Sequence, residues 1–277
     1  MVVAAKPTRP ALRYFGSKWR IAPWVISHFP PHKIYVEPFA GGASILLRKD
    51  PSDVEIYNDL DGEVCNFFRV LRDQCDELME AIRFTPYSRK ELEDIRDKKL
   101  PAPANNVERA RRMYVLSWQM FGGPCAQWKS GWRRSIRDRG TSTIDDWNNI
   151  KHLKACAERL KLVALEVDPA DRVIARYDRP DVLFYVDPPY VPKVIGRTSK
   201  QSYSVELDDF GHRILASQLN SVKAMVIVSG FKSELYDEIF HGWKRVEKIT
   251  RTLRGNGLEC LWLSPRTVAA LKEAAAK

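Results

Sequence analysis

The sequence lacks the patterns that usually mark a metal site or a disulfide framework. Its 277 residues include five cysteines without a Cys-x-x-Cys pair and five histidines without His-Glu-x-x-His spacing. Scattered cysteines of this kind are typical of reduced, packed thiols in a cytosolic protein. We therefore expect no metal ion, no disulfide framework and a cytoplasmic location.

Long apolar stretches are also missing. No hydrophobic run approaches the roughly 20 residues that cross a membrane. The first eleven residues are too few and too polar for a signal peptide. At 44% the hydrophobic content is nevertheless high enough for a large core, so disorder is not expected. The length suits one large α/β domain or a domain with an insert.

Acidic residues are outnumbered. The chain has 45 Lys and Arg against 35 Asp and Glu, a net charge of +10, and a pI near 9.4. Such a balance favours a polyanionic partner, nucleic acid above all, over a merely basic soluble protein if the charge is concentrated. It is concentrated, because residues 83–139 hold fourteen Lys or Arg and six acids.

An apolar run, Val182–Val186, ends in the four residues Asp187, Pro188, Pro189 and Tyr190. The run predicts a buried strand of a parallel sheet, and ligands of such sheets bind at the carboxyl ends of the strands. A carboxylate, a carbonyl acceptor and an aromatic ring would suit a flat group that carries an NH2. The alternative is a strand followed by a proline turn with a capping acid, and these residues alone do not decide.

A glycine-rich turn follows another predicted strand, Ile34–Val36, and precedes a predicted helix that opens at Ile45. The order strand, glycine turn, helix is typical of a nucleotide-binding α/β fold. The turn consists of Glu37, Pro38, Phe39, Ala40, Gly41 and Gly42. It is not G-x-G-x-x-G, and its carboxylate would repel a pyrophosphate and attract an ammonium group. A nicotinamide-dependent dehydrogenase is therefore disfavoured.

A second strand, Val54–Tyr57, leads to Asp59. An acid about twenty residues past the glycine turn is placed to bind ribose hydroxyls, although it can also cap a helix. A ribose and a cationic head occur together in S-adenosylmethionine. Nearer the N-terminus, Gly16 and Lys18 lie in a short motif before a helix predicted over Trp19–Phe29, and the lysine can meet a carboxylate or a phosphate.

The alternation of strands and helices stops between about Cys75 and Leu160. A capping box at Ser88 predicts a helix start, and further helices are predicted over Val107–Phe121 and Thr143–Leu160. The segment 127–140 combines tryptophans, a Ser-Gly turn and arginines, which can stack on bases and hold phosphates. The alternative is a solvated basic loop with its tryptophans in the core. The predicted nucleic-acid contacts are Trp128, Lys129, Trp132, Arg133, Arg134, Arg137 and Arg139, with Tyr203 from a mobile loop over the site.

The α/β pattern then resumes, with a helix predicted over 207–221. Four further strands are predicted at Val163–Val167, Ala224–Val228, Trp243–Ile249 and Leu258–Leu263.

Four separated stretches resemble, in the same order, the motifs of the Dam-like D12 class of N6-adenine-specific DNA methyltransferases. Arg13–Lys18 resembles the N-terminal aromatic-x-G-x-K motif, and Val36–Ser44 resembles the E-P-F-x-G-x-G/A-S cofactor turn. Asp59 stands at the position of the family's ribose-binding acid, and Asp187–Tyr190 is similar to the family's catalytic tetrapeptide. Residues 128–132 resemble the aromatic-K-S-G-aromatic turn of the family's target-recognition domain.

The resemblance implies an α/β, Rossmann-like methyltransferase sheet with a helical target-recognition insert that carries a β-hairpin. The catalytic domain would span 1–75 and 161–277, and the recognition domain 76–160. S-adenosylmethionine would be held by the turn Glu37, Pro38, Phe39, Gly41 and Gly42, by Asp59, and by Asp168 near its adenine. Tyr14 and Lys18 would close the pocket.

The implied reaction is transfer of a methyl group from S-adenosylmethionine to the N6 amino group of a flipped-out adenine in duplex DNA. Asp187 and the Pro188 carbonyl would accept the two N–H groups, and Tyr190 would stack on the base. A bacterial or phage enzyme is implied, with or without a restriction nuclease, as a monomer or weak dimer. The alternatives are an RNA adenine methyltransferase, a protein glutamine methyltransferase, and a DNA-binding protein without activity.

Overall fold

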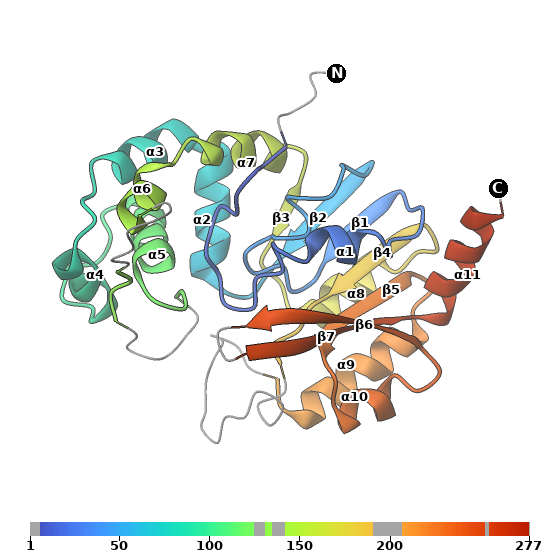
Figure 1. Cartoon of the computed structure of the whole chain (residues 1–277). Coiled ribbons are helices and arrows are strands. Elements are labelled where there is room, and N and C mark those ends of the chain that lie inside the picture. The colour runs from blue at the N-terminus through green and yellow to red at the C-terminus, as the bar shows by residue number, and fades with distance from the viewer. Residues whose placement is uncertain (1–5, 125–130, 135–141, 191–206, 253–254, 277) are drawn as a thin grey trace.

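The computed structural model describes residues 6–124, 131–134, 142–190, 207–252 and 255–276 (Figure 1). Its centre is a seven-stranded sheet with the order β3-β2-β1-β4-β5-β7-β6. The strands are β1 (Ile34–Glu37), β2 (Val54–Asn58), β3 (Ala164–Glu166), β4 (Val182–Val186), β5 (Met225–Phe231), β6 (Lys244–Thr252) and β7 (Gly255–Leu263). All seven predicted strands are present, and the α/β, Rossmann-like sheet is confirmed.

The strand order reverses between β1 and β4. Strands β2 and β3 extend the sheet in one direction from β1, and β5 extends it in the other from β4, all in parallel. Strand β7 runs antiparallel between β5 and β6. A reversal of this kind leaves a crevice at the carboxyl ends of the two central strands. Strand β1 ends at Glu37 and β4 ends at Val186. The D-P-P-Y stretch directly follows Val186.

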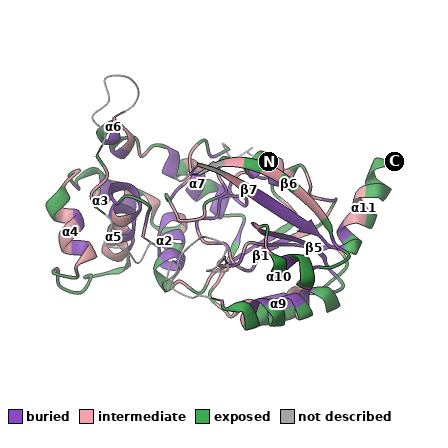
Figure 2. Ribbon diagram, turned by 60° about the horizontal axis from the view of Figure 1, so that its bottom comes forward, coloured by how far each residue is buried: buried purple, intermediate pink, exposed green. Residues whose placement is uncertain are grey.

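Helices cover both faces of the sheet. They are α1 (Ala22–Ile26), α2 (Gly62–Asp73), α8 (Ala170–Tyr177), α9 (Asp209–Ser221), α10 (Glu234–Ile239) and α11 (Pro265–Ala275). Alternate residues of a strand face opposite sides. Accordingly Leu183 and Tyr185 join the apolar core with α2, while Val182, Phe184 and Val186 join the core with α8 and α9. Helices α9 and α10 keep exposed outer faces (Figure 2).

A group of helices lies to one side of the sheet in Figure 1. It comprises α3 (Cys75–Arg83), α4 (Arg89–Arg96), α5 (Asn106–Gln119), α6 (Thr143–Asn148) and α7 (His152–Leu160). The Ser88 hydroxyl accepts a hydrogen bond from the Glu91 amide, which confirms the predicted helix start. Helices α2, α5 and α7 share one apolar core. The division of the chain at residues 76 and 160 therefore stays a prediction.

Three predicted helices are wrong in extent, and the helix predicted over Trp19–Phe29 is shortened to the five residues of α1. The helix predicted over Thr143–Leu160 is broken, because Asn149 leaves helical geometry with ψ 78° and caps α6. The helix predicted to open at Ile45 is a run of turns that ends near Lys49. Ala43 stands in the left-handed region with φ 52°, and Pro51 follows closely, so the segment has too few residues for a regular helix.

The predicted hairpin falls largely outside the described residues. Within them, Met120 and Trp132 form an isolated antiparallel bridge. The Phe121 amide donates to the Gly131 carbonyl at 3.0 Å, and the Arg133 amide donates to the Gln119 carbonyl at 2.7 Å. These contacts join the end of α5 to the start of the basic segment. The hairpin itself stays a prediction.

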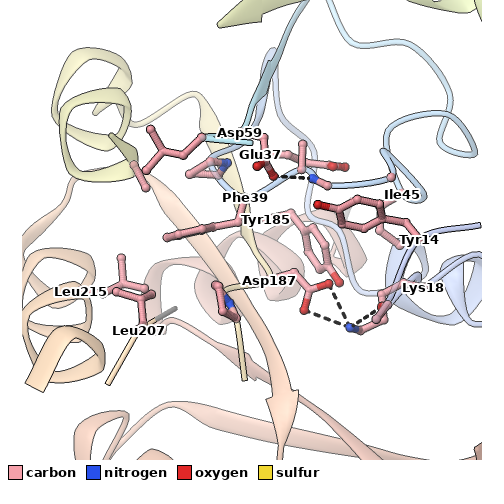
Figure 3. Close-up of a pocket in the computed structure, with 18 of the residues that line it drawn as sticks. Tyr14, Lys18, Glu37, Phe39, Ile45, Asp59, Tyr185, Asp187, Leu207 and Leu215 are labelled. Atoms are coloured by element: carbon pink, nitrogen blue, oxygen red, sulfur yellow. Dashed lines mark hydrogen bonds and ion pairs between the residues drawn. The ribbon is translucent and has the colours of Figure 1, made fainter. Parts of the chain in front are cut away.

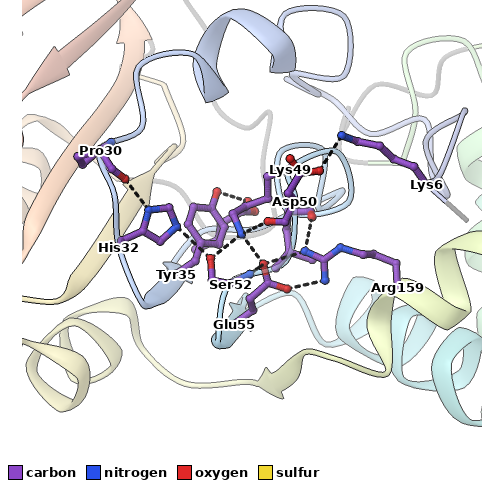
Figure 4. Close-up of polar contacts among 11 residues, drawn as sticks. Lys6, Pro30, His32, Tyr35, Lys49, Asp50, Ser52, Glu55 and Arg159 are labelled. Atoms are coloured by element: carbon purple, nitrogen blue, oxygen red, sulfur yellow. Dashed lines mark hydrogen bonds and ion pairs between the residues drawn. The ribbon is translucent and has the colours of Figure 1, made fainter. Parts of the chain in front are cut away.

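A buried ionic cluster ties the turn segment, the sheet and α7 together (Figure 4). Glu55 of β2 has no exposed side-chain surface and bonds Lys49 on one side. On the other side its Oε2 forms an ion pair of 2.5 Å with Arg159 of α7. Arg159 also donates to the Leu46 carbonyl at 3.0 Å. Three charges are thus buried near the amino end of the sheet.

No helix in the described part of the chain is long and apolar enough to cross a membrane. The same residues contain no group of three or more His, Cys, Asp or Glu arranged to hold a metal ion.

Candidate active site

A cavity of about 360 Å³ lies at the carboxyl ends of β1 and β4 (Figure 3). This volume lies in the range of small-molecule sites. Its walls come from the N-terminal motif, the glycine turn, the end of β2, the start of α8 and one face of α9. Eight of the nine predicted cofactor residues line it: Tyr14, Lys18, Glu37, Pro38, Phe39, Gly41, Gly42 and Asp59.

Asp168 is the exception. Its carboxylate forms an ion pair of 2.6 Å with Arg176, and the cavity wall is made by Pro169, Ala170 and Asp171 instead. The Asp168 backbone is fixed by Asn58, whose side chain accepts from the Asp168 amide and donates to its carbonyl, both at 2.9 Å. The loop was predicted correctly at this edge, but the Asp168 side chain does not line the cavity.

Glu37 presents a buried acid to the cavity. Its side chain is 2% exposed, and the Tyr35 hydroxyl donates to Oε1 at 2.6 Å. Burial raises the pKa of Glu37 to about 8, and the Asp187 charge adds to the rise, while the bonds from Tyr35 and the Leu46 amide oppose it. A cationic ligand beside Glu37 would favour the charged form.

Asp59 holds the glycine turn in place. Its carboxylate accepts from the Gly41 amide at 2.8 Å and the Asp61 amide at 2.9 Å. Burial raises the pKa of Asp59 to about 6, against the opposing effect of these amides. Gly41 has φ +45°, and a Cβ there would stand 2.9 Å from the Tyr14 ring. The turn therefore requires a residue without a side chain, and the ring of Tyr14 covers it.

Lys18 brings the N-terminal motif to the D-P-P-Y stretch. Its ammonium donates to both oxygens of Asp187, at 3.0 and 2.9 Å, and to the Gly16 carbonyl at 3.1 Å (Figure 3). It also bonds the Tyr190 hydroxyl. The Lys18 side chain is 5% exposed and that of Asp187 20%. Burial raises the pKa of Asp187, and the Lys18 charge opposes the rise.

Comparison with known proteins agrees with this geometry. A family model described as D12 class N6 adenine-specific DNA methyltransferase matches residues 14–252, a range that contains the cofactor turn and the D-P-P-Y stretch. The chain belongs to this family. Its reaction is accordingly the methylation of adenine in DNA, and membership implies the use of S-adenosylmethionine.

Three relatives illustrate the similarity. The type II methyltransferase M1.LlaDCHI of Lactococcus lactis subsp. cremoris is 25% identical over 276 residues, which cover 90% of this chain and 89% of that protein. The DNA adenine methylase of Salmonella typhi is 24% identical over 263 residues, 91% of each chain. That of Escherichia coli strain K12 is 24% identical over 267 residues, again 91% of each chain.

The other residues of the tetrapeptide differ in their surroundings. In this D12 methyltransferase Pro189 lines the cavity, whereas Pro188 is buried. Tyr190 is 8% exposed, and its ring lies 4.7 Å from the ring of Phe231, between centroids. The Lys18 ammonium stands 4.7 Å from the centre of the Tyr190 ring. Stacking of Tyr190 on a flipped base stays a prediction.

Several cavity residues were missed from the sequence. Tyr185 contributes from β4, and one face of α9 contributes together with Leu207, which precedes the helix. These wall residues, largely apolar except Gln218, are Leu207, Gly211, Ile214, Leu215 and Gln218. Their spacing of four, three, one and three residues is that of one helix face, so the pattern itself could have indicated a wall facing the sheet.

The basic segment is only partly described. The Trp132 ring is half-buried and lies 5.0 Å from that of Tyr87, and Arg133 forms an ion pair of 2.8 Å with Asp146. Arg134 is exposed. Trp132 and Arg133 therefore have packing roles whatever else they contact. The remaining predicted contacts lie outside the described residues: Trp128, Lys129, Arg137, Arg139 and Tyr203.

More arginines gather beside this segment than the sequence indicated. Burial lowers the pKa of Arg13, and the nearby charges of Arg133, Arg20 and Arg9 lower it further, with Asp146 opposing. Mutual repulsion of this kind marks a concentrated positive charge beside the N-terminal motif of the D12 fold.

Proposed function

We propose that this enzyme methylates N6 of an adenine at a specific site in duplex DNA, with the base flipped out of the helix to reach Asp187. The observation that carries the proposal is that one cavity joins Asp187 to the buried Glu37 and to Asp59. An acceptor for the amino group and a site for a ligand with a cationic head and a ribose thus share one space.

The cavity residues fit S-adenosylmethionine. Glu37 suits the ammonium group of its methionine end, and Asp59 suits ribose hydroxyls. Tyr14 packs closely on the glycine turn, because a Cβ at Gly42 would stand 2.9 Å from the Tyr14 side chain, so the turn and Tyr14 together form one wall of the cavity. Apolar walls from Phe39 and Leu215 suit an adenine ring.

The chain's own residues would hold the target base for an in-line displacement. When bound, S-adenosylmethionine would supply a methyl group from its sulfonium sulfur and leave as S-adenosylhomocysteine, and the methylated nitrogen would lose one proton. Asp187 accepts one N–H of the adenine amino group and the Pro188 carbonyl accepts the other, so that the nitrogen lone pair is directed into the cavity. The positive charge of Lys18 opposes the effect of burial and favours the ionised form of Asp187.

The proposed function is tested by methyl transfer from labelled S-adenosylmethionine to unmethylated bacterial duplex DNA, followed by nucleoside analysis. Label in N6-methyladenine is the expected result, and sequencing of the product then gives the site. Label that appears only in RNA or protein would contradict the substrate and leave the fold unaffected. Cofactor binding without any transfer would support the DNA-binding alternative.

Binding of S-adenosylmethionine at pH 7 is expected to release about one proton from Glu37. With a pKa of about 8 in the free enzyme, Glu37 is mostly neutral at pH 7. An ammonium group beside it stabilises the carboxylate, its pKa falls, and the proton leaves. As the pH rises through 8, Glu37 ionises in the free enzyme, so the release declines and is mostly lost about one pH unit higher. Calorimetry in two buffers of different ionisation enthalpy measures it.

Two variants test whether the released proton comes from Glu37 and not from another acid. Glu37→Gln should show no proton release and about tenfold weaker binding, since an isosteric amide cannot neutralise the ammonium. Glu63→Gln removes an exposed acid that pairs with Arg109 and should behave like the parent enzyme. Buffer-independent binding by the parent enzyme would exclude this role of Glu37.

Arg134→Ala is expected to weaken DNA binding and to reduce the salt dependence by about one counterion. Arg134 is exposed and directly follows Arg133 in the basic segment, which supports a contact with a phosphate. Arg133→Ala is the matched comparison, because Arg133 is engaged by Asp146 and its loss should lower stability as well. Titration of duplex DNA at several salt concentrations measures both. An unchanged slope for Arg134→Ala would place Arg134 away from the phosphates.

A further inference from the structure

A second buried carboxylate, Glu259, lies behind Lys18 and Asp187. It is in β7 and is 4% exposed. The Ser229 hydroxyl of β5 donates to its Oε1 at 2.9 Å, and the Tyr190 hydroxyl donates to the same oxygen at 3.4 Å. The Lys18 ammonium stands 3.7 Å from this oxygen. Glu259 thus contacts the residues that hold Asp187 without lining the cavity itself.

Two acids of this cluster share one cation among the residues that the structure describes. The Lys18 ammonium faces the carboxylates of both Asp187 and Glu259. Burial raises the pKa of Glu259, the Asp187 charge adds to the rise, and Lys18 opposes it. Burying an ionisable group that its neighbours do not neutralise is unfavourable. A second acid is not needed to neutralise Lys18, because Asp187 already does so.

Glu259 can have a role in the proposed reaction through its contact with Lys18. Both oxygens of Asp187 are bonded to the Lys18 ammonium. An acceptor that is shared with an ammonium is weaker toward an adenine amino group, because the positive charge withdraws electron density from it. Asp187 becomes a stronger acceptor if Lys18 has another carboxylate to bind.

We propose that Glu259 is a positioning residue that takes the Lys18 ammonium as the adenine amino group binds Asp187. The inference rests on the proposed function of Asp187. A movement on the order of 1 Å shortens the 3.7 Å contact to the roughly 2.8 Å of a charged hydrogen bond. The Tyr190 hydroxyl bonds both Lys18 and Glu259 and so marks the path of this movement.

Titratable groups surround Glu259 on every element packed against it. Lys18 precedes α1, Asp187 and Tyr190 follow β4, and Tyr185 lies within β4. Lys248 is its register partner on β6, with its ammonium 5.8 Å from the Trp24 ring. Asp187 is the acid whose ionisation the reaction requires, so its pKa sets the acidic limb of the rate profile.

The test is the pH dependence of single-turnover methyl transfer to unmethylated bacterial DNA. Glu259→Gln removes a negative charge near Asp187 and leaves Lys18 wholly on Asp187, and both changes lower the Asp187 pKa. The acidic limb should therefore move to lower pH, and the plateau rate should fall by about 10²-fold. Glu259→Asp keeps the charge and should restore the position of the limb.

Ser229→Ala provides an independent variant if Glu259→Gln does not fold. The Ser229 hydroxyl donates to Glu259 Oε1 and lowers the pKa of Glu259 against burial, so its loss favours neutral Glu259 and should move the limb to lower pH, as Glu259→Gln does. If the acidic limb of these variants stays at the same pH as in the parent enzyme, the proposal is overturned, even if the variants are slower or melt at lower temperatures. If the parent enzyme transfers no methyl group to DNA, the proposed function fails instead.

Discussion

Asp187→Ala should lower the rate of methyl transfer by at least about 10³-fold, a loss of the size seen when one preorganised group at a reacting centre is removed. The Asp187 carboxylate is the acceptor that orients the amino nitrogen, and the truncated side chain leaves no substitute at that position. Cofactor binding should stay within about threefold, since Glu37 and the glycine turn are unchanged. Single-turnover transfer and equilibrium binding measure the two effects separately.

Asp181→Ala is the matched control for this experiment. Asp181 stands just before β4, at the opposite end of the same strand, and its carboxylate pairs with Arg179 near the surface at 3.0 Å. Its loss removes the same chemical group from the same strand and should leave the rate within about twofold. A folded Asp187→Ala protein with a rate within tenfold of the parent would contradict the proposed role of Asp187.

Local pattern was enough to predict the central sheet. The unbroken apolar run of β4 predicted a strand buried on both faces, and all five residues are buried. Glu37 ends β1 and Asp59 directly follows β2, so parallel pairing alone brings them to one edge. Six of the eight predicted cofactor residues that line the cavity belong to these two strand ends, and the other two, Tyr14 and Lys18, come from the N-terminal motif.

Contacts between distant segments were not predictable in the same way. Lys18 and Asp187 are 169 residues apart, and only the resemblance suggested that they meet. Glu259 was overlooked because an acid in a strand is usually exposed, and nothing in its neighbours shows that it faces Lys18. The break at Asn149 depends on a single residue in a segment whose composition otherwise favours one helix.

The buried cluster around Glu55 could not be predicted from the sequence either. Lys49, Glu55 and Arg159 look like ordinary charged residues there, yet their side chains are at most 4% exposed. Burial lowers the pKa of Lys49, while the charge and hydrogen bond of Glu55 oppose this. Glu55 therefore favours the charged form of Lys49 inside the protein, and its carboxylate also pairs with the buried Arg159 guanidinium.

Glu55→Ala is expected to lower the free energy of unfolding by about 3–5 kcal/mol, because it leaves two buried cations without their carboxylate. The cluster lies near the amino end of the sheet, so the folded fraction should keep its rate of methyl transfer. Glu158→Ala is the control: Glu158 pairs with Lys161 in solvent at 2.8 Å, and its loss should leave the free energy of unfolding nearly unchanged. Denaturant titration measures both.

Replacing the whole cluster by apolar residues separates the two possible causes of that loss. If the unpaired cations are the cause, a triple variant with Met at 49 and 159 and Leu at 55 should recover most of the stability, because desolvation of the charges is removed with the pair. If the loss comes from the cavity left by a shorter side chain, Glu55→Leu alone should recover as much as the triple variant, because it fills the volume and leaves both cations in place. A triple variant no more stable than Glu55→Ala would mean that hydrogen bonds of the cluster, such as that from Arg159 to the Leu46 carbonyl, hold the turn segment in place.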